Sequence, residues 1–289
     1  RRPPISTLFP YTTLFRSVGL SGNERGNSEV GHLNLGAGRI VFQDKSYIDN
    51  ELSLDKLKHN QTMAQILEYV QKNNSNIHLA GLVSYGGIHS HINHLITLLE
   101  YFAQFSYIKD KIYIHAFTDG RDSPTHEALT TFSHLLEKMK QFDCGKIATV
   151  SGRYYAMDRD NHWERTEETY DAIVSGIGEK EKSSLAAISS AYNHNESDEF
   201  ITPTVITDDA GVPIALVKDN DVFIYFNFRS DRARQLTLAL AKKDFNKFHR
   251  KKIVNDLFFV TMVPYGIEKD FDTSNIYSLF RQAENNECL

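Results

Sequence analysis

The sequence is poor in the residues that hold small extracellular or metal-bound folds together. Only two of its 289 residues are cysteines, Cys144 and Cys288, and they do not form a closely spaced pair. This scarcity argues against a disulfide framework or a zinc ribbon and favours a reducing, cytoplasmic setting. Basic residues are not in excess either, because the formal net charge is -5. We therefore expect no broad attraction to nucleic acid or to an anionic membrane.

Long apolar runs are also missing, and none approaches the roughly 18 residues that a membrane-spanning helix needs. The hydrophobic fraction of 41% and the charged fraction of 24% are those of an ordinary globular protein. With 289 residues, the chain can bury the core of one large domain or of two ordinary ones.

The first 17 residues, RRPPISTLFPYTTLFRS, differ from everything that follows. Prolines and hydroxyl residues interrupt the apolar stretch, which argues against a signal peptide. The near-repeat of STLF and TTLF resembles translated sequencing-adapter sequence, although a disordered native tail is an alternative. We therefore treat residues 1–17 as a non-native segment and leave them out of the fold prediction.

Beyond residue 76 the sequence alternates apolar, β-branched runs with amphipathic helical patterns. Strands that alternate with helices predict an α/β fold with a mostly parallel sheet and helices on both faces. A small antiparallel hairpin is expected within residues 204–217. The apolar runs are 77–85, 112–117, 147–150, 222–228 and 257–263, and the helical patterns are 92–102, 124–139, 170–174, 184–192 and 236–240.

Arginine, unlike lysine, is confined to the segments that follow three of these apolar runs. Ligands of open α/β sheets bind at the carboxyl ends of strands, and a guanidinium group binds phosphate or carboxylate through two hydrogen bonds. We therefore predict a small ligand with two anionic groups. The alternative is that the arginines form structural ion pairs with neighbouring aspartates. The arginines between residues 40 and 249 are Arg121, Arg153, Arg159, Arg165, Arg229, Arg232 and Arg234, and the aspartates are Asp119, Asp122, Asp158, Asp160 and Asp231.

A glycine-rich segment, residues 26–38, carries Ser28. Its first six residues have P-loop spacing, but His32 and Leu33 stand where a P-loop has lysine and serine or threonine. A phosphate on Ser28 would meet the free N–H groups and the positive dipole of a helix start. From spacing alone, a plain helix N-cap at Asn27 or Ser28 is the simpler interpretation.

Three histidines, His89, His91 and His94, follow the first apolar run. Zinc binding is weakly supported, because His91 and His94 fall in the helical pattern and no further ligand follows at zinc-like spacing. His89 lies beside two loop glycines. It is therefore better placed to hydrogen-bond to a substrate or to shuttle a proton.

Five segments, taken together and in order, resemble the motif series of cofactor-independent phosphoglycerate mutases, in the alkaline phosphatase superfamily. The segments are GNSEVGHLNLGAGRIV, SYGGIHSHINHL, FTDGRDSP, SGRYYAMDRDNHWER and FNFRSDRARQ. The resemblance implies an isomerase that interconverts 3-phosphoglycerate and 2-phosphoglycerate in glycolysis and gluconeogenesis. It also implies a cytoplasmic monomer whose partner is this small substrate, with no nucleic acid and no membrane involved.

The resemblance further implies roles for particular residues. Ser28 would be the catalytic nucleophile, forming a phosphoserine intermediate, and would also contact one of two Mn²⁺ ions. Such a metal pair clamps the attacking and leaving oxygens and neutralises charge on the phosphoryl group. The substrate would be held by His89, Arg121, Asp122, Arg153, Arg159, Arg229 and Arg232.

The family pairs a phosphatase-like domain, built from both chain ends, with an inserted transferase domain. The resemblance therefore implies a phosphatase-like stub at 18–43, a transferase domain at 44–278 and the start of a return segment at 279–289. The family's first aspartate motif and its later Asp and His metal ligands have no counterpart in this sequence. We therefore expect a chain incomplete at both ends that binds metal poorly and lacks mutase activity.

Two alternatives remain open at this point. Another phosphomutase or a sulfatase of the alkaline phosphatase type would lack the arginine sets of GRYYAMDRD and FRSDRARQ. A non-catalytic module that binds phosphorylated acids would keep the arginines without the metal centre.

Overall fold

A computed structural model describes residues 44–267 and 276–281 of the chain. In this part of the protein one sheet has the strand order β4-β5-β3-β2-β1-β6-β7-β8. Every neighbouring pair is parallel except β3 and β5, so that β4 and β5 run against the other strands. The strands are β1 (Ile77–Leu82), β2 (Ile112–Thr118), β3 (Lys146–Gly152), β4 (Glu179–Glu181), β5 (Thr204–Ile206), β6 (Val222–Tyr225), β7 (Phe258–Thr261) and β8 (Ile276–Ser278).

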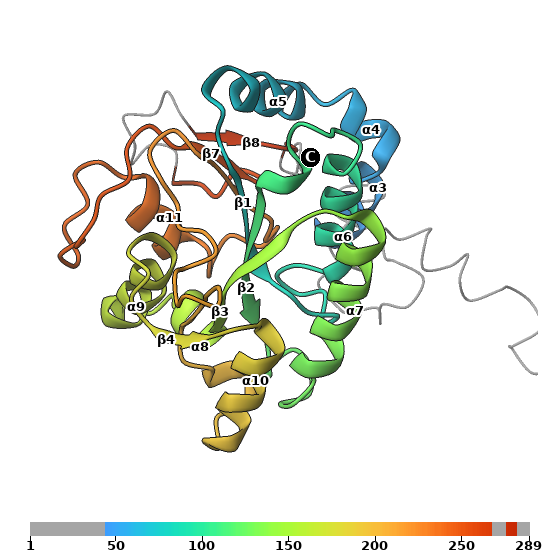
Figure 1. Ribbon diagram of the computed structural model, residues 1–289. Coiled ribbons are helices and arrows are strands. Elements are labelled where there is room, and N and C mark those ends of the chain that lie inside the picture. The colour runs from blue at the N-terminus through green and yellow to red at the C-terminus, as the bar shows by residue number, and fades with distance from the viewer. Residues whose placement is uncertain (1–43, 268–275, 282–289) are drawn as a thin grey trace, which may run out of the picture.

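Helices cover both faces of this sheet. The chain steps from β1 to β2 to β3 in one direction and from β6 to β7 in the other. Because such crossovers are right-handed, the two series place their helices on opposite faces. Figure 1 shows α6 and α7 on one side and α9 and α11 on the other. The helices are α3 (Asp44–Glu51), α4 (Leu54–Lys58), α5 (Gln61–Asn73), α6 (Ile92–Phe102), α7 (Ala128–Phe142), α8 (Arg153–Ala156), α9 (Trp163–Val174), α10 (Ser184–Asn193) and α11 (Arg234–Ala241).

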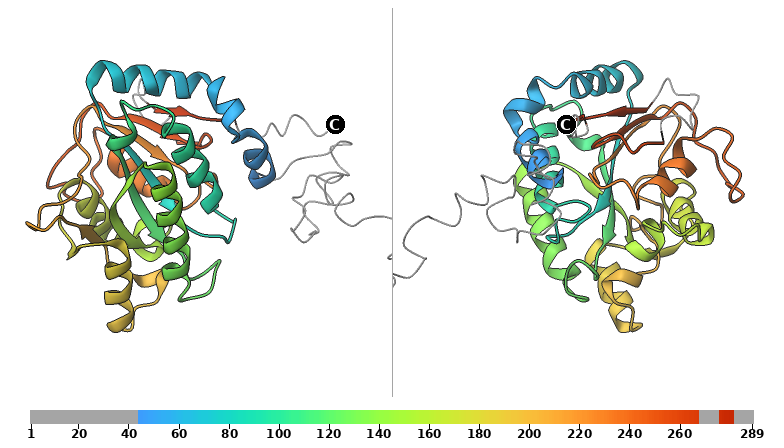
Figure 2. Two further views of the ribbon diagram at one scale, coloured as in Figure 1. Left: turned by 45° about the vertical axis from the view of Figure 1, so that its right-hand side comes forward. Right: turned by 180° about the vertical axis from the view of Figure 1, so that it is seen from behind.

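The central strands explain why the sequence shows apolar runs rather than alternation. Every residue of β1, β6 and β7 is buried. A parallel strand covered by helices on both faces has no solvent side, so that its sequence is apolar throughout. The further views in Figure 2 show α5 across one end of the molecule and α10 at the other. The prediction of a mostly parallel α/β sheet with helices on both faces is confirmed.

Of two local predictions, one was wrong in detail and the other is confirmed. The helix expected to open at Pro124 begins at Ala128, where the backbone N–H groups of Glu127 and Ala128 donate to Oδ2 of Asp198 at 2.8 and 2.9 Å. A distant carboxylate thus caps this helix start. The expected antiparallel hairpin is present in a short form, with the bridge Thr207 to Pro213 and a backbone hydrogen bond from the N–H of Ile214 to the carbonyl oxygen of Ile206 at 2.9 Å.

The position of β6 reverses the order in which the strands are added to the sheet. After β3 the chain returns and places β6 beside β1, on the side away from β2. The connections that leave β1 and β6 therefore run to opposite faces of the sheet. A reversal of this kind opens a crevice at the carboxyl ends of the strands, which is where α/β sheets bind ligands.

No helix in the described part of the chain is long and apolar enough to cross a membrane. The stub predicted for residues 18–43 and most of the segment 279–289 lie outside the described residues, and so does Ser28.

Candidate functional site

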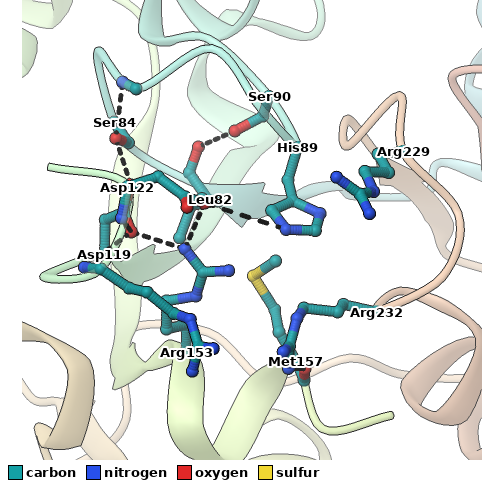
Figure 3. Close-up of polar contacts among 12 residues, drawn as sticks. Leu82, Ser84, His89, Ser90, Asp119, Asp122, Arg153, Met157, Arg229 and Arg232 are labelled. Carbon is teal, nitrogen blue, oxygen red and sulfur yellow. Dashed lines mark hydrogen bonds and ion pairs between the residues drawn. The ribbon is translucent and has the colours of Figure 1, made fainter. Parts of the chain in front are cut away.

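Loops from four parallel strands meet at the carboxyl edge of the sheet. The backbone carbonyl of His89, after β1, accepts hydrogen bonds from the N–H groups of Phe228 and Arg229, after β6, at 2.8 and 3.3 Å. The two loops on either side of the crevice are thereby joined. Figure 3 shows His89 between the group of Asp119, Asp122 and Arg153 on one side and Arg229 on the other.

Asp119 organises the loops that follow β1, β2 and β3. It is 3% exposed, and its carboxylate accepts hydrogen bonds from Ser84 Oγ at 2.5 Å and from the N–H of Asp122 at 2.9 Å. It also accepts from the N–H of Arg121 at 3.2 Å and from Nη1 of Arg153 at 2.6 Å. Burial would raise the pKa of Asp119, but these bonds and the charge of Arg153 hold it below its usual value.

Two glycines of the sequence motifs let a neighbouring segment approach these loops. Gly120 has a φ of +69°, and a Cβ there would lie 2.6 Å from the backbone nitrogen of Glu199. A Cβ on Gly152 would lie 2.4 Å from the carbonyl oxygen of Glu199. Only glycine fits such a close approach of two backbones. The contact brings the Glu199 carboxylate to 3.4 Å from Nη1 of Arg121, whose side chain is 56% exposed.

Arg153 is the buried arginine of the candidate site, with 2% of its surface exposed. The same Nη1 atom that bonds to Asp119 lies 2.6 Å from Oδ2 of Asp122. Burial alone would lower the pKa of Arg153, but the bonds and charges of the two aspartates raise it. Arg153 thus forms ion pairs of the kind that the alternative interpretation expects, at a loop position that borders the crevice.

His89 is 3% exposed and lies between two carboxylates. Its Nε2 atom is 3.8 Å from Oδ2 of Asp122, and its Nδ1 atom is 3.6 Å from Oδ1 of Asp231. Both distances exceed that of a hydrogen bond. Burial, and then the charge of Arg153, lowers the pKa of His89 to about 4. The imidazole is therefore neutral at physiological pH and can donate one hydrogen bond and accept another.

Asp231 pairs with two half-exposed arginines, Arg159 and Arg229. Its carboxylate lies 2.9 Å from Nη1 of Arg159 and 3.1 Å from Nε of Arg229. Burial would raise the pKa of Asp231, but the charge of Arg229 and the bond from Arg159 lower it. Asp231 appeared in the sequence prediction only as a general ion-pair partner. Its central place could not be seen there, because Arg159 and Asp231 are 72 positions apart.

Arg232 has no carboxylate partner in the described part of the chain. Its Nη1 atom donates to the carbonyl oxygen of Met157 at 3.1 Å. Burial lowers the pKa of Arg232, and the charges of Arg159, Arg153 and Arg121 lower it further. A guanidinium surrounded by like charges is a position where a ligand anion would be stabilised. This unbalanced cation is what distinguishes the cluster from a set of closed ion pairs.

Two of the seven arginines do not join the cluster. Arg165 lies over the ring of Tyr154, 4.0 Å from its centroid, and pairs with Asp158 at 3.1 Å. Arg234 donates from Nε to the carbonyl oxygen of Tyr265 at 2.9 Å. Both therefore stabilise the surrounding loops rather than face the crevice. Neither of them was among the predicted substrate-binding residues.

His91 and His94 lie outside the cluster, and the described residues do not contain the predicted metal site. His91 is the N-cap of α6, and Nε2 of His94 lies 2.7 Å from Oδ1 of Asp49. Residues 44–267 and 276–281 contain no group of three or more His, Cys, Asp or Glu side chains placed to hold a metal ion. The described residues thus do not provide a donor set for Mn²⁺. Ser28, predicted as nucleophile and metal contact, lies outside them.

Comparison with known proteins agrees with this architecture. The family model described as BPG-independent PGAM N-terminus matches residues 48–267. A 2,3-bisphosphoglycerate-independent phosphoglycerate mutase of Clostridium kluyveri is 46% identical over 282 residues, which are 96% of this chain and 53% of that protein. The enzyme of the same name from Methanococcoides burtonii is 48% identical over 261 residues, covering 89% of this chain and 50% of that protein.

A solved structure shows the same fold. The crystal structure of Leishmania mexicana phosphoglycerate mutase at low cobalt concentration matches with a TM-score of 0.79 and 30% identity, covering 88% of this chain and 48% of that one. This chain spans about half the length of the curated relatives it matches. The resemblance seen in the sequence is confirmed. The chain belongs to the family of 2,3-bisphosphoglycerate-independent phosphoglycerate mutases, within which it matches the part described as the N-terminus.

Proposed function

We propose that this chain is the substrate-binding part of a phosphoglycerate mutase, an isomerase that interconverts 3-phosphoglycerate and 2-phosphoglycerate. The observation that carries the proposal is the cluster at the β1–β6 crevice, where five guanidinium groups face four carboxylates beside a neutral imidazole. The positive charge is in excess and centres on Arg232, as an anionic ligand requires. The groups are Arg121, Arg153, Arg159, Arg229 and Arg232 with Asp119, Asp122, Asp231 and Glu199.

The substrate matches this cluster chemically. Phosphoglycerate carries a phosphate and a carboxylate, and each can accept paired hydrogen bonds from an arginine. The neutral His89 would donate to or accept from a substrate hydroxyl, with Asp122 beside it as a second acceptor. Arg121, Arg159, Arg229 and Arg232 would bind the anionic groups. Arg153, held by two aspartates, would shape the loops around them.

The chemical step would use residues beyond this cluster. The family resemblance assigns the nucleophile to Ser28, which would carry the phosphoryl group while the glycerate reorients. A bound pair of Mn²⁺ ions would supply charge neutralisation for that transfer. The described residues would bind and orient the glycerate. We also infer the predicted division into domains, a monomeric state and a cytoplasmic location, all of which rest on the family resemblance.

Calorimetric titration of the purified chain with 3-phosphoglycerate tests the proposal. We expect saturable binding that Arg232→Gln weakens, whereas the distant surface variant Lys247→Gln leaves it unchanged. Glycerate and acetate should bind more weakly, because each offers a single carboxylate. Absence of binding, or equal affinity for all three ligands, would count against a phosphoglycerate site.

A turnover assay addresses the separate question of activity. We infer from the family resemblance, which places most ligands of the predicted metal pair in motifs that this sequence does not contain, that the chain alone lacks mutase activity. Conversion of 3-phosphoglycerate by the purified chain, measured with and without added Mn²⁺, would contradict this inference.

A further inference from the structure

Two aspartates of the candidate site are bound in different ways. Asp119 accepts hydrogen bonds from a serine hydroxyl, from two backbone N–H groups and from a buried arginine. Asp231 receives none from backbone or hydroxyl groups among the contacts of the described residues. It pairs only with the guanidinium groups of Arg159 and Arg229, whose side chains are 45% and 48% exposed. The local fold therefore depends on Asp119 but not on the charge of Asp231.

Asp231 also leaves part of its own hydrogen-bonding capacity unused. Its Oδ1 atom is buried and lies 3.1 Å from Nε of Arg229, in an ion pair that lacks the geometry of a hydrogen bond. The facing Nδ1 atom of His89, 3.6 Å away, is likewise without a hydrogen-bond partner. A carboxylate needed as a fixed structural acceptor would have these positions filled. The arrangement is that of an anion held by charge between two arginines.

We propose that Asp231 is an internal counter-ion, which an anionic ligand group must displace from Arg159 and Arg229. The proposal rests on the proposed function, because it assumes that these arginines bind the ligand. Exposed ion pairs are individually weak, so that a phosphate or carboxylate group can replace this one. In the absence of ligand Asp231 keeps the two arginines in position and partly neutralised. As a consequence, Asp231 lowers the affinity of the site for every anion that binds to Arg159 and Arg229.

The test compares wild-type protein with Asp231→Asn, a substitution that keeps the shape and removes the charge. Inorganic phosphate, acetate and 3-phosphoglycerate are titrated separately by calorimetry at low ionic strength. We expect Asp231→Asn to bind inorganic phosphate about two- to tenfold more tightly, because two weak pairs no longer compete. The acetate titration shows whether a carboxylate gains equally, which identifies the ligand group that takes the place of Asp231. A gain for either anion supports the proposal.

Control variants distinguish a failure of the counter-ion proposal from a failure of the proposed function. Asp244→Asn removes a surface carboxylate that pairs only with Lys242, at 3.8 Å, and should leave every affinity unchanged. Asp231→Ala, checked by thermal unfolding, should reproduce the gain if the asparagine side chain itself disturbs the arginines. Equal or weaker anion binding by both Asp231 variants, with wild-type binding intact, would overturn the counter-ion proposal alone. Loss of anion binding in all proteins, wild type included, would overturn the proposed function as well.

Discussion

Two groups of polar side chains lie inside this fold, and they are built in opposite ways. In the middle of the sheet, Asp221, His78, His115 and Thr149 form a row from the start of β6 across β1 and β2 to β3. The atoms in contact are Asp221 Oδ2 and His78 Nε2 at 3.2 Å, His78 Nδ1 and His115 Nε2 at 2.9 Å, and His115 Nδ1 and Thr149 Oγ1 at 2.9 Å. At the carboxyl edge lies the cluster of arginines and carboxylates described above.

The row is closed, because every ring nitrogen in it has one partner. The hydroxyl of Thr149 can donate to His115, His115 to His78, and His78 to Asp221, so that two neutral imidazoles satisfy all of them. Complete burial, and then the neighbouring His78, keeps the pKa of His115 well below its usual value. The row therefore has no capacity left for a ligand, and it stabilises the sheet.

The edge cluster is open by the same criterion. The Nδ1 atom of His89 and the Oδ1 atom of Asp231 have no hydrogen-bond partner in the described structure, and Arg232 has no carboxylate there. Both groups contain buried titratable side chains, so burial and polarity do not tell them apart. What distinguishes the edge cluster from the row is the hydrogen-bonding capacity and charge that the described structure leaves unmatched.

The largest expected effect is a loss of stability. It would show that Arg153, although part of the edge cluster, stabilises the fold as the row does. Arg153→Met should lower the free energy of unfolding by about 3–5 kcal/mol, because it leaves Asp119 and Asp122 without their buried partner. Urea denaturation measures the change. The exposed matched control, Arg159→Met, should cost at most about 1 kcal/mol. Similar losses in both variants would show that burial does not separate the two arginines.

The next effect concerns the open part of the cluster. Arg232→Gln should weaken 3-phosphoglycerate binding about 10- to 100-fold, the loss of one charged hydrogen bond. Its unfolding free energy should stay close to that of wild type, because the repulsion from three neighbouring arginines outweighs the attraction of Asp231 and Arg232 forms no ion pair among the described residues. Calorimetry and urea denaturation on the same preparation separate the two quantities. A strong loss of stability with unchanged affinity would show that Arg232 stabilises the fold and does not bind the ligand.

A substitution in the closed row should lower stability and leave ligand affinity unchanged. Thr149→Val keeps the side-chain shape but leaves Nδ1 of His115 without a partner, which should cost about 1–3 kcal/mol of stability. Ligand affinity should not change. Thr130→Val, at an exposed position of α7, is the control for the loss of a threonine hydroxyl. A change in 3-phosphoglycerate affinity caused by Thr149→Val alone would connect the row to the site.

The smallest effect is a pH dependence. Because the folded-state pKa of His115 lies well below its usual value of 6.5, the unfolded chain binds the proton more readily as the pH falls below 6.5. The stabilising contribution of neutral His115 is therefore complete above about pH 6.5 and is lost toward lower pH, by at most about 1.4 kcal/mol per pH unit. His89, with a pKa of about 4, acts in the same direction between pH 6.5 and 4. Denaturation of His115→Asn should show a shallower slope than wild type, and an identical slope would contradict the lowered pKa.

Much of the fold could be predicted because its signals are local. The apolar runs correctly placed β1, β2, β3, β6 and β7, since a strand buried on both faces needs a continuous apolar sequence. The boundaries were less exact, and the start of α7 was missed because its cap, Asp198, comes from a distant segment. The short hairpin around Thr207 and Pro213 was predicted because its signal is local, whereas the pairing of β5 with β3 and β4 was not predicted.

By itself the sequence determined the alternation of strands and helices, the family, and the residue types at the carboxyl ends of the strands. Only the tertiary structure decided that β6 lies beside β1, so that His89 and Arg229 face one crevice while Arg165 turns to Tyr154. It also decided which aspartate each arginine meets. The physical reason is that periodicity acts over a few residues, whereas strand order and ion pairing depend on packing between segments far apart in the chain.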